Sequence, residues 1–409
     1  MANLSTWIGS NRVGEFREEH QSEGSLFTFE YAGGATSADI VSLTMIPTRD
    51  SRQFSMRSFP PPFDMILPEG ERRSRIESAR KIVPSDPFSL LSYIGVNPVN
   101  RVRFLAPSVS PYGIVPPLPT PAEIAHCTQG QALFNRLLKK LDLRQGIAGV
   151  QPKILGLPTS LAKMSPDARR YRGSTHILKA STDQFPFLAV NEWICLEVFK
   201  IAGLKVPQVT LSADGELLLV ERFDVLPDGS WLGFEEAAAL MGETAATKYQ
   251  RDYGSLVDSL AEFVPAKTEE SLRRDMIQAL ILNYLLGNGD AHLKNFGLLY
   301  HDGSDAALAP FYDCVSTLAY IADDVPALAL SFEWYSKDWW PRIRLEEFAY
   351  HYGRLSRAET RLLIEASISA IVQGLGHVRR CKREIPAFTT LGTRLETLWS
   401  ERIKTFAKG

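Results

Sequence analysis

Cysteine is scarce in this sequence of 409 residues. The four cysteines are widely scattered, and no two of them form a Cys-x-x-Cys pair: they are Cys127, Cys195, Cys314 and Cys381. A zinc cluster or a disulfide framework needs cysteines at closer or more regular spacing, so the sequence argues against both. Sparse, scattered cysteine is typical of a protein that works in a reducing compartment.

Hydrophobic segments that would target the chain to a membrane are also missing. Residues 1–7 (MANLSTW) contain neither the basic region nor the apolar core of a secretory signal. No apolar run approaches the ~20 residues of a membrane-spanning helix, and the candidate at residues 279–286 is interrupted by Asn283. We therefore expect a cytoplasmic protein with no membrane partner.

Neither sign of charge is in excess. The chain has 45 Lys and Arg against 47 Asp and Glu, a formal net charge of −2, so charge gives no case for direct binding of nucleic acid. One basic run, residues 379–383, fits either a solvated helix end or a patch that faces nucleic acid. The Gly-x-Ser-x-Gly and His-Glu-x-x-His motifs of serine hydrolases and zinc proteases are absent.

The composition changes along the chain in a way that indicates separate structural units. Residues 1–106 predict short strands and then a helix at 72–83, and residues 107–124 form a linker with six prolines. Helices and strands alternate in residues 125–234, whereas helices dominate residues 235–409. This order predicts two lobes behind a small β-rich N-terminal subdomain. In the second lobe we expect Thr268 to cap a helix that ends at Gly287.

The strongest local motif is Gly287-Asn-Gly-Asp-Ala-His-Leu-Lys-Asn-Phe296. Asp290 and Asn295 lie five residues apart in a glycine-rich turn after a long apolar segment, the spacing found in a protein-kinase catalytic loop. Phosphoryl transfer needs a carboxylate near the attacking hydroxyl and oxygen ligands for magnesium. Asp313 ends the following run, Leu308-Ala-Pro-Phe-Tyr-Asp313, and is a candidate metal ligand.

Two further side chains of this loop are candidates for contact with phosphate. His292 and Lys294 could either position the loop or bind a phosphate group. The alternative for the whole segment is an ordinary Asn/Gly/Asp turn, in which the Asp290 side chain only caps backbone groups of the turn.

A second candidate lies on a predicted strand. Thr175-His-Ile-Leu-Lys179 ends in a lysine that could present its charge to the phosphates of ATP. The next predicted helix carries Glu192 on the same face as Leu196 and Phe199, and a carboxylate on a packed face needs a cationic partner. Lys179 is the candidate partner; the alternatives are a strand-end lysine that reaches solvent and a solvated Glu192.

Two weaker motifs complete the set. Gly146-Ile-Ala-Gly-Val-Gln-Pro-Lys153 is rich in small residues, which let backbone N–H groups approach phosphate, although a plain turn would also explain it. Val220-Glu-Arg-Phe-Asp224 ends a predicted buried strand, and it is either a hinge that binds adenine or a simple strand end.

In this order the motifs resemble the HipA family of bacterial serine/threonine kinases, the toxins of HipBA toxin–antitoxin modules. The segments that carry the resemblance are Ala148-Gly-Val-Gln-Pro-Lys153, Thr175-His-Ile-Leu-Lys179, Asn191-Glu192, Ala202-Gly-Leu-Lys-Val-Pro207, Val220-Glu-Arg-Phe-Asp224, Gly287 to Phe296 and Ala309-Pro-Phe-Tyr-Asp313. In the first hundred residues, Trp7 to Phe16, Leu67-Pro-Glu-Gly70 and Asp86 to Gly95 are also similar to the family. The resemblance implies an α+β, two-lobed protein-kinase-like fold with a small β-rich N-terminal subdomain and a mainly helical C-terminal lobe.

The resemblance also implies roles for single residues. Asp290 would be the catalytic base, Lys179 would bind the phosphates of ATP, and Asn295 and Asp313 would bind Mg²⁺. Glu221 and Phe223 would contact adenine, with Asp224 near the ribose. The phosphate loop would consist of Ala148, Gly149, Val150, Gln151 and Lys153.

Partners and substrates follow from the family as well. Its members phosphorylate cytoplasmic proteins, with aminoacyl-tRNA synthetases among the targets, and thereby arrest growth and produce persistence. A HipB-like helix-turn-helix antitoxin would bind the chain and connect it to DNA only indirectly. Two alternatives stay open: a small-molecule kinase of the aminoglycoside-phosphotransferase type, and a non-catalytic co-repressor bound to an antitoxin.

One position departs from the family pattern. The serine whose phosphorylation inactivates family members lies two residues before the Ala-Gly pair, and Gly146 occupies that position here. Neither Gly146 nor Ile147 can accept a phosphate, so the sequence predicts that this form of autoregulation is lost.

Overall fold

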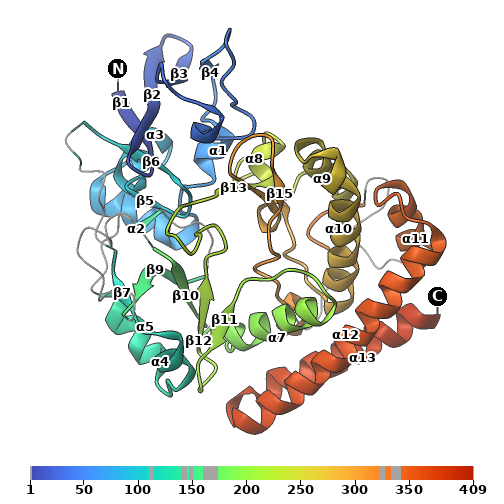
Figure 1. Ribbon diagram of the computed structural model, residues 1–409. Coiled ribbons are helices and arrows are strands. Elements are labelled where there is room, and N and C mark those ends of the chain that lie inside the picture. Colours follow the sequence, from blue (N-terminus) through green and yellow to red (C-terminus); the bar gives the residue numbers. More distant parts are fainter. Residues whose placement is uncertain are drawn as a thin grey trace.

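The computed structural model describes residues 2–107, 109, 115–139, 145–146, 151–159, 174–321, 328–332 and 342–408 (Figure 1). The chain forms an N-terminal subdomain, a β-rich lobe (N-lobe) and a helical lobe (C-lobe), in that order along the sequence. In Figure 1 the subdomain is blue, the N-lobe sheet is green, and the helices of the C-lobe run from yellow to red. This is the two-lobed α+β arrangement that the sequence predicts.

The N-terminal subdomain is an antiparallel sheet packed against short helices. Its strand order is β4-β3-β2-β1-β6. The elements are β1 (Ala2–Ile8), β2 (Asn11–Gln21), β3 (Gly24–Tyr31), η1 (Ser37–Asp39), β4 (Gln53–Met56), α1 (Pro61–Asp64), α2 (Gly70–Arg80), α3 (Pro87–Ile94), β5 (Asn97–Pro98) and β6 (Val102–Leu105). Phe16 is fully buried at the centre and its ring packs on Phe63 and Phe88, at centroid distances of 4.8 and 5.2 Å.

The N-lobe contains a second five-stranded sheet, ordered β11-β12-β10-β9-β7. Its elements are β7 (Pro117–Leu118), α4 (Pro121–Ala125), α5 (Gly130–Leu138), β8 (Gln145–Gly146), β9 (Lys153–Pro158), β10 (His176–Ala180), α7 (Leu188–Ile201), β11 (Val209–Leu211) and β12 (Leu217–Glu221). Because β7 pairs with β9, the second half of the predicted linker contributes to this sheet. Strand β8 pairs with β5 of the subdomain.

The C-lobe is built around helix α10 (Ala266–Leu286), which is buried on nearly every side from Met276 onward. The other elements are β13 (Gly233–Glu236), α8 (Ala237–Leu240), α9 (Tyr253–Phe263), η2 (Leu293–Asn295), β14 (Gly297–Tyr300), β15 (Ala307–Leu308), η3 (Thr317–Ala319), α11 (Arg342–His351), α12 (Arg357–Glu384), η4 (Pro386–Phe388) and α13 (Thr389–Lys408). Among the described helices, none combines the length and the apolar character needed to span a bilayer.

Helix α13 supports the end of α10. The Trp399 indole N–H donates to the carbonyl oxygen of Leu286 at 3.1 Å, and Arg402 donates to the carbonyl oxygen of Tyr284. These carbonyls belong to the last turn of α10, where the regular helical hydrogen bonds end, and the Tyr284 carbonyl also accepts from the Gly287 N–H at 3.2 Å. The residue that follows, Gly287, ends α10 in the left-handed conformation (φ 72°), as the sequence predicts.

The N-terminal subdomain packs directly on the C-lobe. Ile40, Leu43 and Met65 belong to the same apolar cluster as the C-lobe helices. Buried polar contacts join the two parts as well: Glu235 accepts hydrogen bonds from the Ser42 hydroxyl at 2.5 Å and from the Leu43 N–H at 2.7 Å. The subdomain is therefore held against the lobe that carries the catalytic-loop motif.

Candidate functional site

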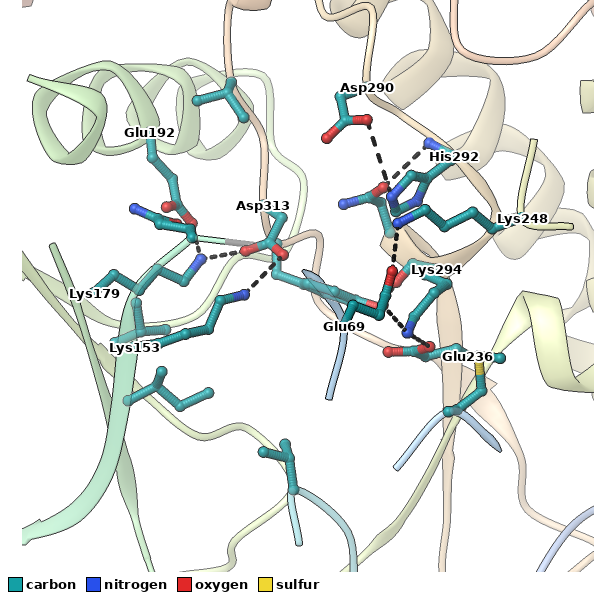
Figure 2. Close-up of a pocket in the computed structure, with 18 of the residues that line it drawn as sticks. Glu69, Lys153, Lys179, Glu192, Glu236, Lys248, Asp290, His292, Lys294 and Asp313 are labelled. Atoms are coloured by element: carbon teal, nitrogen blue, oxygen red, sulfur yellow. Dashed lines mark hydrogen bonds and ion pairs between the residues drawn. The ribbon is translucent and has the colours of Figure 1, made fainter. Parts of the chain in front are cut away.

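A cavity of about 870 Å³ lies between the lobes. It is lined by strands β9, β10 and β12 of the N-lobe, by the segment 289–295 of the C-lobe, and by residues of the N-terminal subdomain. Figure 2 shows two groups of charged side chains in it: one group surrounds Asp313, and the other surrounds Glu69. Most of the residues singled out from the sequence line this one cavity.

The first group depends on strand pairing. Lys153 on β9 and Lys179 on β10 are directly opposite each other in an antiparallel pair, so both side chains project from the same face of the sheet. Lys179 Nζ forms ion pairs with Glu192 on α7 and with Asp313, as predicted for Glu192. Lys153 Nζ lies 3.8 Å from the other oxygen of Asp313.

These ion pairs fix the charge of Lys179, whose side chain is only 4% exposed. Burial alone would lower the pKa of Lys179, but the facing carboxylates of Asp313 and Glu192 outweigh burial and raise it. Burial alone would raise the pKa of Asp313, yet Lys153 and Lys179 hold the pKa of that carboxyl well below its usual range. The site thus holds a charged lysine beside an ionised aspartate.

Asp313 adopts an unusual backbone conformation, with φ 52°. Asp and Asn tolerate this left-handed region better than most residues with a side chain.

The second predicted carboxylate, Asp290, follows the end of α10 and is about half exposed (52%). Its Oδ1 accepts a hydrogen bond from the Tyr249 phenol at 2.6 Å. His292 Nε2 lies 4.0 Å from the same oxygen, and burial lowers the pKa of His292 to about 4, so the ring is neutral near pH 7. The carboxylate is therefore within reach of solvent and faces a neutral imidazole and a phenol.

Asn295 and Asp313 were predicted to bind magnesium, and both line the cavity. Among the described residues, no cluster of three or more His, Cys, Asp or Glu side chains could hold a metal. Mg²⁺ in phosphotransfer sites needs only one or two protein oxygens because phosphates and water supply the others. One carboxylate and one amide oxygen fit that requirement. The Asn295 amide oxygen meanwhile accepts from the His292 N–H at 3.1 Å.

The predicted hinge begins in the last two residues of β12. The Glu221 N–H donates to Gln208 and the Arg222 N–H donates to Thr175, so sheet pairing already occupies both donors. Asp224 forms a buried two-point ion pair with Arg222, at 3.0 and 2.6 Å. All three residues line the cavity together with Phe223, and a contact from Glu221 or Phe223 to adenine, or from Asp224 to ribose, stays a prediction.

Part of the predicted phosphate loop, Ala148, Gly149 and Val150, lies outside the described residues. Gln151 and Lys153 both line the cavity, and the Gln151 side chain donates to the Ala180 carbonyl at 3.2 Å.

The charged and hydroxyl-bearing cavity residues that sequence reasoning missed include Glu69, Glu236, Lys248 and Tyr249. Lys294 Nζ contacts Glu69 at 2.6 Å and Glu236 at 3.6 Å, and Lys248 Nζ contacts Glu69 at 2.8 Å. The segment Leu67-Pro-Glu-Gly70 stands out in the sequence only by its similarity to the family. No local motif indicates that its carboxylate lies beside Lys294.

The fold and the site together define a two-lobed, protein-kinase-like chain. Family models match two segments: residues 4–105 match the HipA N-terminal domain, and residues 145–375 match the HipA-like C-terminal domain. The chain belongs to the HipA family.

Individual proteins agree with this assignment. The protein Y4mE of Sinorhizobium fredii is 29% identical over 350 residues, which cover 80% of each chain. The serine/threonine-protein kinase toxin HipA of Shewanella oneidensis is 25% identical over 277 residues, or 62% of each chain. A solved complex of Shewanella oneidensis HipA with HipB and operator DNA matches with a TM-score of 0.72 at 19% identity, covering 99% of this chain and 98% of that one. This last likeness supports the fold.

Proposed function

We propose that this chain is a Mg-ATP-dependent serine/threonine protein kinase and the toxin of a toxin–antitoxin module. The observation that carries the proposal is the convergence of Lys179, Glu192 and Asp313, with Asp290 in the same cavity. These four side chains come from two lobes, and together they supply the charges that phosphoryl transfer needs.

Each residue has a definite task in this proposal. Lys179, held in place by Glu192, binds the phosphates of ATP, and Lys153 adds a second positive charge. Asp290 orients the acceptor hydroxyl and accepts its proton, because its half-exposed carboxylate is open to an incoming protein. Asp313 and Asn295 hold magnesium, which supplies charge neutralisation at the transferring phosphate.

The partners are proposed from the relatives. The Shewanella oneidensis protein is named as a serine/threonine-protein kinase toxin, and its solved complex contains HipB and operator DNA. We therefore assign this chain a cytoplasmic protein substrate, with an aminoacyl-tRNA synthetase as the first candidate to test, and a HipB-like antitoxin that would connect it to DNA.

The test compares wild type with Asp290→Asn. Transfer of labelled γ-phosphate from Mg-ATP into the proteins of a bacterial lysate should fall at least ~100-fold, since the proton acceptor and its charge are both lost. Nucleotide affinity should stay within ~3-fold, because the lysines that face the phosphates are intact. Asp302→Asn, in an exposed turn, is the matched control.

Two results would contradict the proposal. One is transfer by Asp290→Asn at the wild-type rate, and the other is wild-type protein that binds Mg-ATP but labels no protein. Growth gives an independent readout: expression of wild type should arrest a bacterial host, and Asp290→Asn at equal protein level should not.

A further inference from the structure

Glu69 belongs to the N-terminal subdomain, yet its carboxylate lies in the cavity between the lobes. It is the N-cap residue of α2, with extended backbone (φ −116°, ψ 167°), and its side chain accepts no hydrogen bond from that helix. Side chains at N-cap positions commonly bond to the first turn of their own helix. Glu69 instead accepts hydrogen bonds from Lys294 Nζ at 2.6 Å and Lys248 Nζ at 2.8 Å (Figure 2).

The two lysines adjoin the groups that would carry out the chemistry. Lys294 immediately precedes Asn295, and Lys248 immediately precedes Tyr249, whose phenol bonds to Asp290. Only 5% of the Lys294 side chain is exposed. Glu69 thus binds one lysine that is next to Asn295 in the sequence and another that is next to Tyr249, the residue in contact with Asp290.

Neutralising Lys294 does not by itself require Glu69. Glu236 lies 3.6 Å from Lys294 Nζ, and its Oε2 has no hydrogen-bond partner among the described residues. Lys294 Nζ therefore lies closer to Glu69 than to Glu236, although both carboxylates are near it. This geometry indicates that Glu69 determines the direction of the lysine side chain rather than only its charge balance.

We propose that Glu69 is a positioning residue for phosphoryl transfer, which makes the N-terminal subdomain a structural part of the active site. The inference rests on the proposed function. A lysine has a flexible four-carbon stem, and binding at Glu69 confines its ammonium group to one place in the cavity. Stabilisation of a transferring phosphoryl group depends on such fixed charges, and a 1 Å displacement can cost ~100-fold in rate.

The backbone on either side of Glu69 is well fixed, which supports this role. Leu67, two residues earlier, is buried in the core of the N-terminal subdomain, and Gly70, the next residue, has φ 57°. The turn that presents the carboxylate is thus tied to a packed core and requires a residue that tolerates positive φ.

The test uses Glu69→Gln, Glu69→Asp and the control Glu77→Gln. Glu77 is a buried glutamate on the same helix, it pairs with Arg73 at 2.7 Å, and it lies outside the cavity. All proteins are full-length, and kcat and KM for ATP are measured from phosphate transfer to lysate proteins and from hydrolysis of Mg-ATP alone. Thermal midpoints and nucleotide Kd values are measured in parallel.

We expect Glu69→Gln to lower kcat by ~10- to 100-fold with KM for ATP within ~3-fold of wild type, because Lys153 and Lys179 remain. Glu69→Asp keeps the charge and should recover part of the loss. The inference is overturned if Glu69→Gln matches Glu77→Gln in kcat, if its loss lies in KM alone, or if it melts far below Glu77→Gln. An inactive wild type would instead refute the proposed function, and this inference with it.

Discussion

The phenol of Tyr249 donates a hydrogen bond to Oδ1 of Asp290 over 2.6 Å. Tyr249 is itself 40% exposed, and its ring also meets His292 edge-on at 5.0 Å. A protein acceptor would bring its own hydroxyl to the same carboxylate. The contact therefore places an internal hydroxyl where a substrate hydroxyl is expected to bind.

Tyr249→Phe should raise kcat/KM for protein substrate a few-fold. A hydrogen bond to a charged group at this exposed position contributes about 1 kcal/mol, and an acceptor no longer has to displace it. Steady-state phosphorylation with varied acceptor concentration measures the effect, and KM for ATP should not move. A ~10-fold loss would show that Tyr249 orients the base.

Asp313→Asn should weaken Mg-ATP binding by at least ~10-fold. The substitution removes a carboxylate that the proposed metal site needs, while asparagine tolerates the left-handed backbone of this position. Calorimetric titration with and without magnesium measures the loss, and Asp305→Asn on the surface serves as control. If both variants bind Mg-ATP as wild type does, Asp313 holds no metal. Alanine is a poorer probe because it adds backbone strain.

Lys179→Ala should destabilise the fold as well as impair nucleotide binding. The lysine is buried between Glu192 and Asp313, and removing one member of a buried ion pair costs about 3–5 kcal/mol because the remaining charges lose their partner. Thermal melting should show a drop that the double variant Lys179→Met/Glu192→Leu partly reverses. An unchanged melting temperature for Lys179→Ala would mean that water reaches Glu192 and Asp313 and replaces the lost lysine as their partner.

His176 should make the fold sensitive to acid. Burial lowers the pKa of His176 to about 4, below the ~6.5 of an exposed histidine, so the unfolded chain binds the extra proton first. The stability that neutral His176 provides is complete above pH 6.5 and is lost as the pH falls toward 4, with about 1 kcal/mol lost by pH 5.5.

The matched variant for this prediction is His176→Gln. Its stability deficit relative to wild type should shrink by about 1 kcal/mol between pH 7.5 and 5.5, because only the wild type bears the protonation cost. Buried Glu235, whose pKa is raised to about 7 mainly by burial, titrates equally in both proteins and cancels. Denaturant melts at the two pH values give the difference, and a constant deficit would contradict the prediction. His20→Gln, at an exposed strand end, is the control.

The sequence predicts those features that depend on residues close to one another along the chain. The helix end at Gly287 is confirmed because it depends on a left-handed glycine, and Asp290 and Asn295 of the same continuous motif both line the cavity. Lys179 and Glu192 were paired correctly because β10 leads into α7 after a short connection. The capping role of Thr268 was wrong: α10 already begins at Ala266, and the Thr268 hydroxyl donates to the Pro265 carbonyl from within the first turn.

Glu69 could not be predicted in the same way. It lies 225 residues from Lys294 along the chain, and the contact depends on how the N-terminal subdomain packs on the C-lobe. The same holds for Tyr249, which comes from an irregular segment with no pattern of its own. Long-range placement of this kind is set by packing, which one sequence without an alignment does not reveal.

The hydrogen bonds from α13 to the end of α10 have a consequence for synthesis on the ribosome. Trp399 and Arg402 are translated more than a hundred residues after the carbonyls of Leu286 and Tyr284 that they bind. At ~5–20 residues per second, this interval is roughly 10 s. During that time the end of α10, which precedes Asp290, lacks its hydrogen bonds from Trp399 and Arg402. A nascent chain would therefore not yet have a complete proposed active site.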